Sequence, residues 1–187
     1  MGKIYEQIDD RVRAFIEAQK MFFVATAPRS DEGHVNLSPK GYEDSFAITG
    51  PKSVAYVDLG GSGIETVAHL RENARITIMF CAFEGPANIL RLYGTGRVVQ
   101  FNEPGFDKAM ELFPGVERAR NVIHVDVTRI QDSCGWGVPF YDFKGERDQL
   151  SRATNNMEFD AWAEKRLTRN AESLDGLPGL LRQPGAK

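Results

Sequence analysis

Short apolar segments of strand type, closely spaced along the chain, are the feature that most limits the folds open to this sequence. Each segment is bounded by glycine, proline or charged residues, as strands that end in turns usually are. They lie at 22–27, 35–38, 46–50, 53–59, 75–83, 89–101 and 122–130. Because few helices interrupt them, we predict a mainly β protein: a β-barrel of six to seven antiparallel strands with flanking helices.

Helical spacing of apolar residues appears outside these strands. It predicts an amphipathic helix over 4–19 and a second helix over 64–73. Ser62 is placed to cap the second helix, and Glu65, three residues later, would complete a capping box. Two further helices are predicted at 104–113 and 159–171. Glycine at 94 or 96 predicts a bend in the longest strand.

The composition of the chain changes near residue 145. Residues 1–145 are predicted to form the barrel domain with its N-terminal helix. Residues 146–187 are more polar and are predicted to form a C-terminal helical extension, with a disordered tail over 176–187.

Charge and composition exclude several classes of partner. A net charge of −3 without a block of Lys or Arg argues against a nucleic-acid surface. We expect no signal peptide and no membrane span, because no segment is apolar over the required length. Cys81 and Cys134 are expected to be free thiols, which indicates a reducing, cytoplasmic location.

A glycine-rich turn, "GGSG" at 60–63, joins a predicted strand to a predicted helix. A Rossmann fingerprint would need a third glycine, and a P-loop would need Lys and Ser or Thr where Ile64 and Glu65 stand. The sequence therefore excludes both standard nucleotide-binding loops.

The same turn could still bind an anion. Gly61 and Gly63 permit positive φ, and the free N–H groups of the following helix attract negative charge. Ser62 and Thr66 add hydroxyl donors. The alternative is an ordinary capped turn in which Ser62 serves only the helix.

A polar strand face lies in "HVNLSPKG". Asn36 and Ser38 share one face, and Lys40 follows Pro39, which we expect to end the regular ladder. This pattern indicates either a ligand lying along the strand or an edge strand with a wet face.

Arg75 and Arg91 lie in apolar strands, so each needs a partner. That partner is either phosphate or a carboxylate from Asp58, Glu65 or Glu84.

An aromatic loop, "SCGWGVPFYDF", would cover a planar ligand, form a subunit interface or fold on itself. With three histidines and no metal-binding spacing, we expect no metal site.

The order of these motifs resembles a known family. "HVNLSPKG", then "AYVDLGGSGIETVAHLRENARITIMF", then "ILRLYGTGRV" is similar to the pyridoxamine 5'-phosphate oxidase-like family of FMN-binding split β-barrels, over residues 22–127. That family carries an E-L-x-x-N-P element before an apolar strand. "AHLRENARITIMF" resembles it, with Ala74 in place of proline.

The resemblance implies a homodimer that binds FMN in clefts between its subunits and acts on a small molecule. It implies cofactor-binding positions beside the ring and ribityl chain at Asn36, Leu37, Ser38, Pro39 and Lys40, with Tyr56, Val57 and Asp58 lining the side of the next strand. It places the phosphate at Ser62, Gly63 and Thr66, and Arg91 near the ring or the phosphate. Trp136 would reach the flavin from the partner subunit or cap it.

The sequence also departs from the family pattern. The oxidase has a basic R-x-V-L-L-K strand and an S-R-K phosphate turn, where this chain has "HVNLSPK" and "SGIET". No histidine follows His124, so the oxidase's C-terminal Arg-x-His element is missing. We therefore expect an FMN-dependent oxidoreductase with a substrate other than pyridoxamine phosphate. The alternatives are an F420-dependent reductase and a non-enzymatic flavin- or haem-binding protein.

Overall fold

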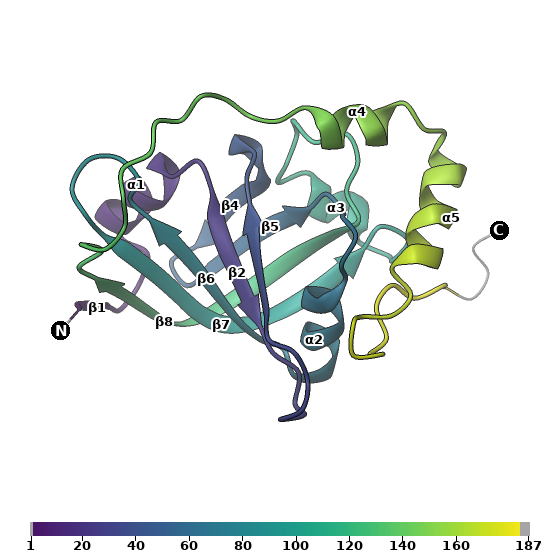
Figure 1. Cartoon of the computed structure of the whole chain (residues 1–187), viewed down its shortest axis with the longest axis horizontal. Helices are drawn as coiled ribbons and strands as arrows, with labels where there is room; N and C mark the ends of the chain where they lie inside the picture. Colours follow the sequence, from purple (N-terminus) through teal and green to yellow (C-terminus); the bar gives the residue numbers. More distant parts are fainter. Residues whose placement is uncertain (1, 184–187) are drawn as a thin grey trace.

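A curved antiparallel sheet forms the centre of the protein, whose computed structural model describes residues 2–183 (Figure 1). Its strands are β1 Ile4–Tyr5, β2 Phe22–Thr26, β3 Asn36–Lys40, β4 Phe46–Gly50, β5 Ser53–Asp58, β6 Arg75–Cys81, β7 Ile89–Gln100 and β8 Asn121–Ser133. They are hydrogen-bonded in the order β3-β2-β6-β7-β8-β5-β4, and β1 pairs with β8. The predicted mainly β fold, a split β-barrel, is confirmed; the eighth strand is the two-residue β1.

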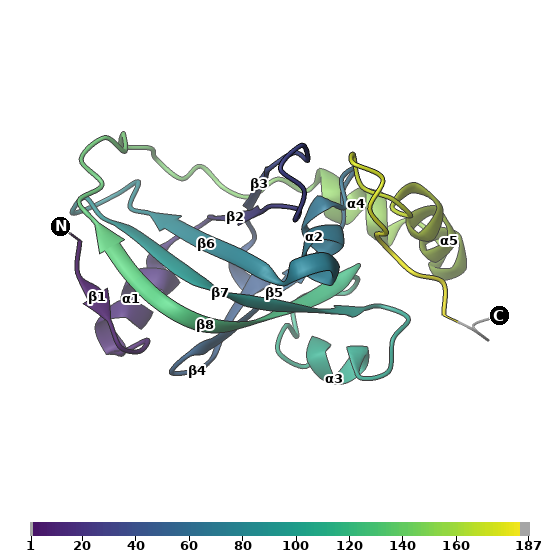
Figure 2. The same cartoon turned by 90° about the horizontal axis from the view of Figure 1, so that it is seen from below.

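Helices flank this sheet. They are α1 Asp10–Ala18, α2 Glu65–Asn73, α3 Phe106–Met110, α4 Gln149–Asn155 and α5 Phe159–Arg169, with a 3-10 turn, η1, at Glu43–Ser45. The helices α2 and α3 lie on opposite sides of the β7–β8 ribbon (Figure 2). No helix within residues 2–183 is long and apolar enough to cross a bilayer.

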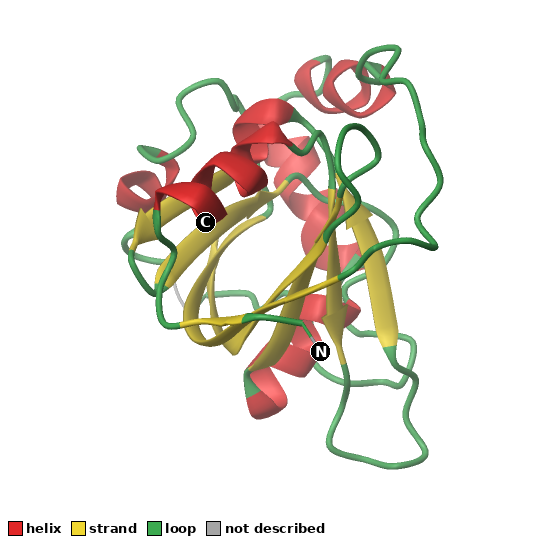
Figure 3. Cartoon of the chain, turned by 90° about the vertical axis from the view of Figure 1, so that its left-hand side faces the viewer, coloured by secondary structure: helices red, strands yellow, loops and turns green. Residues whose placement is uncertain are grey.

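The interior is filled by alternate residues of the strands, which curve around it (Figure 3). Val24, Ile78, Leu92 and Ile130 form one row across β2, β6, β7 and β8. All four are buried in one apolar cluster, which α1 joins. Because side chains alternate along a strand, the neighbouring residues point to the outer face.

Gly94 produces the predicted bend in β7. The register between β7 and β8 shifts between Tyr93 and Gly94, which marks an irregularity of the bulge type. A Cβ atom added at Gly94 would lie 2.2 Å from the carbonyl oxygen of Asp126, so only glycine allows the two strands to approach here.

Two boundaries near the N-terminus differ from the prediction. The first helix begins at Asp10 rather than at residue 4, because the Asp9 side chain accepts a hydrogen bond from the Val12 N–H at 2.8 Å and caps it. The strand β3 does not stop before Pro39 but pairs through Lys40. Proline is tolerated there because β3 is an edge strand.

The C-terminal extension is more ordered than expected. After β8 the chain crosses the molecule to α4, which was not predicted, and to α5, which was (Figure 1). The predicted disorder of residues 176–187 is wrong as far as residue 183: Leu180 is buried against Ile64 and Val67 of the α2 region. Residues 184–187 lie outside the described part of the chain. The domain boundary at 145 stays a prediction.

Leu180→Ala should lower the free energy of unfolding by about 2–5 kcal/mol, because it removes a buried side chain that joins the extension to α2. Chemical denaturation measures this change. Leu181→Ala, at a side chain that is 41% exposed, is the matched control and should have little effect. Equal losses in the two variants would contradict the packing of the tail.

Candidate functional site

The inner face of β3 is polar at the open edge of the barrel. Asn36, Ser38 and Lys40 lie opposite Thr26, Val24 and Phe22 of β2, respectively. Residues directly opposite each other in a sheet share a face, so these three side chains lie on the face that is apolar elsewhere in the barrel. The polar strand face read from the sequence is therefore present, and it points inward.

Hydrogen bonds join this face to the start of α2. The Asn36 amide Nδ2 donates to Thr66 Oγ1 at 3.0 Å and to Thr26 Oγ1 at 3.3 Å. Ser38 Oγ donates to the Asn36 amide oxygen at 3.0 Å. The structure thus brings together Asn36, Ser38 and Thr66, which stand up to 30 residues apart in sequence.

A buried carboxylate anchors the other end of β3. Arg120 donates to Asp58 Oδ2 through Nε at 3.1 Å and through Nη2 at 2.8 Å. Lys40 Nζ lies 3.5 Å from Asp58 Oδ1, which also accepts from the Gly60 N–H at 3.3 Å. Both side chains of the Asp58–Arg120 pair are 5% exposed.

Charge around Asp58 decides its ionisation. Burial by itself would raise the pKa of this carboxyl, but the charges of Arg120 and Lys40 and the hydrogen bonds from Arg120 and Gly60 outweigh it. The pKa of Asp58 is therefore held well below its usual range, and the group is a carboxylate under all ordinary conditions.

The glycine turn differs from the prediction in its cap. The helix α2 begins at Glu65, with Ile64 at the cap position and no side-chain hydrogen bond, so Ser62 stands too early to cap it. Of the turn's glycines, Gly60 alone has positive φ, at 95°. Glu65 folds back over the helix start, since a Cβ atom added at Gly63 would lie 2.2 Å from its Oε2.

The remaining predicted residues lie elsewhere. Val57 is buried in a second apolar cluster, apart from the interior cluster that includes Val24 and Phe22. Tyr56 is buried in that interior cluster, where its ring packs against Phe22, the residue opposite Lys40. Leu37 and Pro39 point to the outer face and are exposed. Trp136 follows β8 and is 86% exposed.

The arginines in apolar strands use neutral partners. Arg91 donates to Ser133 Oγ at 2.9 Å, on the outer face. Arg75 donates to the Asn73 side chain and to the Pro28 carbonyl oxygen. The predicted carboxylate partners are therefore wrong for both arginines. Asp58 is instead paired with Arg120, which sequence reasoning missed because nothing local marks it among other arginines.

A large groove follows the outer side of β2 and β3. Its volume is about 1080 Å³, and it extends to the segment after β8. The residues that give it its aromatic and aliphatic lining are Met21, Phe23, Pro39, Phe83, Tyr141 and Phe143. Tyr141 is tied to this side by its N–H, which donates to the Phe83 carbonyl oxygen at 3.1 Å.

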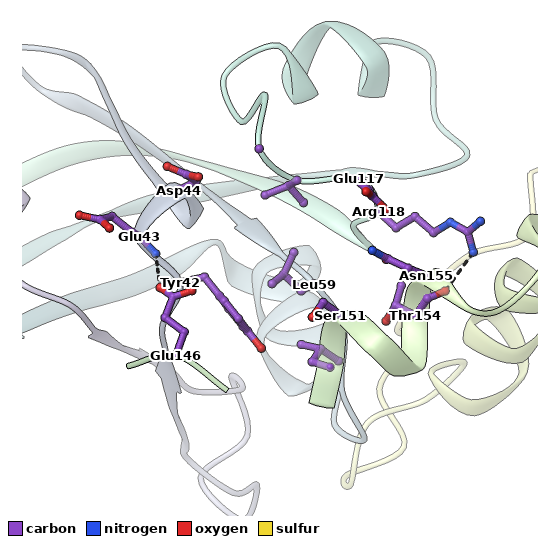
Figure 4. Close-up of a pocket in the computed structure, with 13 residues that line it drawn as sticks. Tyr42, Glu43, Asp44, Leu59, Glu117, Arg118, Glu146, Ser151, Thr154 and Asn155 are labelled. Atoms are coloured by element: carbon purple, nitrogen blue, oxygen red, sulfur yellow. Dashed lines mark hydrogen bonds between the residues drawn. The ribbon is translucent and has the colours of Figure 1, made fainter. Parts of the chain in front are cut away.

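A smaller cavity of about 310 Å³ lies under α4 (Figure 4). Glu43 donates its N–H to Glu146 Oε1 at 2.7 Å, and Arg118 donates to the Thr154 carbonyl oxygen at 3.0 Å. Although several acidic side chains line the cavity, no group of three potential ligands within residues 2–183 is arranged to hold a metal ion.

Comparison with known proteins places these features in a family. The family model described as pyridoxamine 5'-phosphate oxidase matches residues 8–134. The chain is 42% identical over 197 residues to the pyridoxamine 5'-phosphate oxidase family protein ustO of Aspergillus flavus, and the match covers 96% of this chain and 78% of that protein.

A solved structure shares the fold. HupZ of Group A Streptococcus matches with a TM-score of 0.55 and 22% identity, over 72% of this chain and 99% of that chain. At this identity the likeness is one of fold alone.

Asp58→Asn should lower the free energy of unfolding at pH 7 by about 3–5 kcal/mol, because it leaves Arg120 buried without its counter-charge. The pKa of Asp58 is lower in the folded state than in the unfolded state, where the pKa of Asp is about 3.9. The ionised group therefore stabilises the fold fully above the unfolded pKa, and this stabilisation is lost as the pH falls from there through the folded pKa. The difference in the free energy of unfolding between wild type and variant should therefore become smaller between pH 5 and pH 2, as measured by urea denaturation.

Asp126→Asn removes an exposed carboxylate on β8 and serves as the control. A gap between wild type and Asp58→Asn that stays constant with pH would show that Asp58 does not carry this charge pairing.

Proposed function

The chain belongs to the pyridoxamine 5'-phosphate oxidase family, and from this premise we propose that it is an FMN-dependent oxidoreductase. One observation carries the proposal: the polar inner face of β3 is joined by hydrogen bonds to Thr66 at the start of α2. A continuous polar track at the open edge of an apolar barrel is suited to a ligand that has many hydroxyl groups and ends in an anion.

The donors along the track fit the parts of FMN in order. Asn36 and Ser38 offer an amide and a hydroxyl, which can both donate and accept, as the ribityl hydroxyls and the ring edge require. Ser62, Gly63 and Thr66 stand at the end where the phosphate would lie. When bound, the flavin supplies hydride or electron transfer, while the chain binds it, orients it and adjusts its potential.

We propose that the substrate differs from that of the oxidase that names the family. Within residues 125–187 there is no histidine, so these residues hold no Arg-x-His element of the kind that binds pyridoxamine phosphate in that enzyme. We therefore assign a different small molecule as substrate. The two cysteines, Cys81 and Cys134, are free, which supports a reducing, cytoplasmic location.

We further propose that two copies of the chain associate through the outer face of β2 and β3. Large apolar side chains there and in the segment after β8 are open to solvent: Val35 is 74% exposed, Leu37 63%, Trp136 86%, Phe140 79% and Tyr141 62%. An isolated chain would leave this area in water, whereas a second copy would cover it. Arg91 and Trp136, which lie away from their own polar track, would then face the flavin of the partner subunit.

Wild-type protein should quench the fluorescence of added FMN on binding. The double variant Ser62→Ala with Thr66→Val should weaken FMN binding by about 2–5 kcal/mol, because each hydroxyl that bonds a charged phosphate contributes at most about 1.5–3 kcal/mol. Fluorescence titration gives the affinity. Ser30→Ala with Thr49→Val, at exposed positions, is the matched control.

A colourless wild-type protein that takes up no FMN would overturn the proposed function. An unchanged affinity in a folded double variant would instead show that the phosphate lies elsewhere.

Leu37→Arg should convert the dimer into a monomer, because a charge would be buried at the centre of the proposed interface. Light scattering coupled to size-exclusion chromatography reports the mass. Thr49→Arg, at an exposed position on β4, should leave the dimer intact. A monomeric wild-type protein would rule out the interface.

A further inference from the structure

The helix α5 lies beside the glycine turn, although more than 100 residues separate them in sequence. Arg166 Nη1 donates to the Gly61 carbonyl oxygen at 3.3 Å. Asn170 Nδ2, just after the helix, donates to the Gly61 and Ser62 carbonyl oxygens at 3.4 and 3.2 Å. The extension is therefore fixed directly to the turn that leads into α2.

Gly60 allows this close approach. Its φ of 95° favours glycine, and a Cβ atom added to it would lie 3.2 Å from Cζ of Arg166. The guanidinium group thus lies against bare backbone at the turn.

A cavity of about 410 Å³ remains between the turn and the extension. Its lining is Gly61, Ser62, Ala153, Met157, Trp162, Lys165, Arg166 and Arg169. Three of these side chains are cationic and none is acidic, so the cavity carries an uncompensated positive charge.

The cations that face this cavity differ in their pairing from two other arginines of the extension. Elsewhere on the extension, Arg152 pairs with Asp148 at 3.1 Å and Arg182 pairs with Glu164 at 2.6 Å. In the part of the chain that the structure describes, no ion pair joins Lys165, Arg166 or Arg169 to an acid. A counter-ion for these three side chains would therefore be a bound group from outside the described chain.

The charges around Arg166 agree with this arrangement. Burial lowers the pKa of Arg166, the charges of Arg120 and Arg169 lower it further, and Asp58 opposes them. A negatively charged group in the cavity would relieve the repulsion among these cations.

The start of α2 attracts a phosphate less strongly than a free helix N-terminus would. Glu65 folds back beside Gly63, and its Oε1 accepts from the Leu174 N–H at 3.2 Å. A phosphate at the turn would therefore lie near the Glu65 carboxylate, and it needs cations close by to offset the repulsion.

We propose that Lys165, Arg166 and Arg169 of α5, together with Ser62, bind the phosphate of FMN in the cavity between the glycine turn and the extension. This inference rests on the proposed function and deepens it. The C-terminal extension would then supply the cations that the turn itself lacks.

The test compares FMN with riboflavin, which lacks only the phosphate. In the double variant Lys165→Gln with Arg169→Gln, the affinity for FMN should fall about tenfold or more, since charge-assisted contacts to the phosphate are lost. Riboflavin affinity should change less than about twofold, because its contacts remain. Added salt should weaken FMN binding more steeply in wild type than in the variant.

Two further proteins complete the experiment. Lys52→Gln with Lys108→Gln removes the same charge at exposed positions outside the cavity and should bind FMN like wild type. Arg166→Gln should reduce the preference for FMN over riboflavin in the same way, with folding checked by thermal unfolding.

An unchanged preference for FMN in the folded double variant would overturn this inference, while FMN binding itself would leave the proposed function standing. Wild-type protein that binds neither flavin would overturn the proposed function and this inference with it.

Discussion

The buried carboxylate of Asp58 is the interaction on which the arrangement of the candidate site depends. A charge removed from water is tolerated only when its partners meet it closely, and Arg120, Lys40 and the Gly60 N–H do so. These groups come from the approach to β8, the end of β3 and the glycine turn. The pairing therefore ties the end of β3, the approach to β8 and the glycine turn together through side chains, in addition to the hydrogen bonds of the sheet.

The strand β3 has two different roles because its side chains alternate. Its inner residues, Asn36, Ser38 and Lys40, contribute the polar track, and its outer residues, Leu37 and Pro39, contribute the apolar face. As an edge strand of the described sheet, it has a neighbouring strand on one side only. One short segment thus supports the proposed cofactor site and the proposed subunit interface together.

Much of the fold could be predicted because the strands are short, apolar and separated by clear turns. The bend at Gly94 and the polar face of β3 followed from local rules, and the structure confirms both. The cap at Ser62 was wrong because a local motif cannot show where the helix starts once Glu65 folds back. The order of the tail was missed because Leu180 is stabilised by residues more than 100 positions away.

By itself the sequence determined the strands, the glycine turn and the absence of Arg and Lys from that turn. Those properties depend on neighbours within a few residues. Only the tertiary structure decided that Arg120 pairs with Asp58 and that Lys165, Arg166 and Arg169 lie beside the turn. Charges act through space, and nothing in a linear pattern records which distant segment folding brings within a few ångströms.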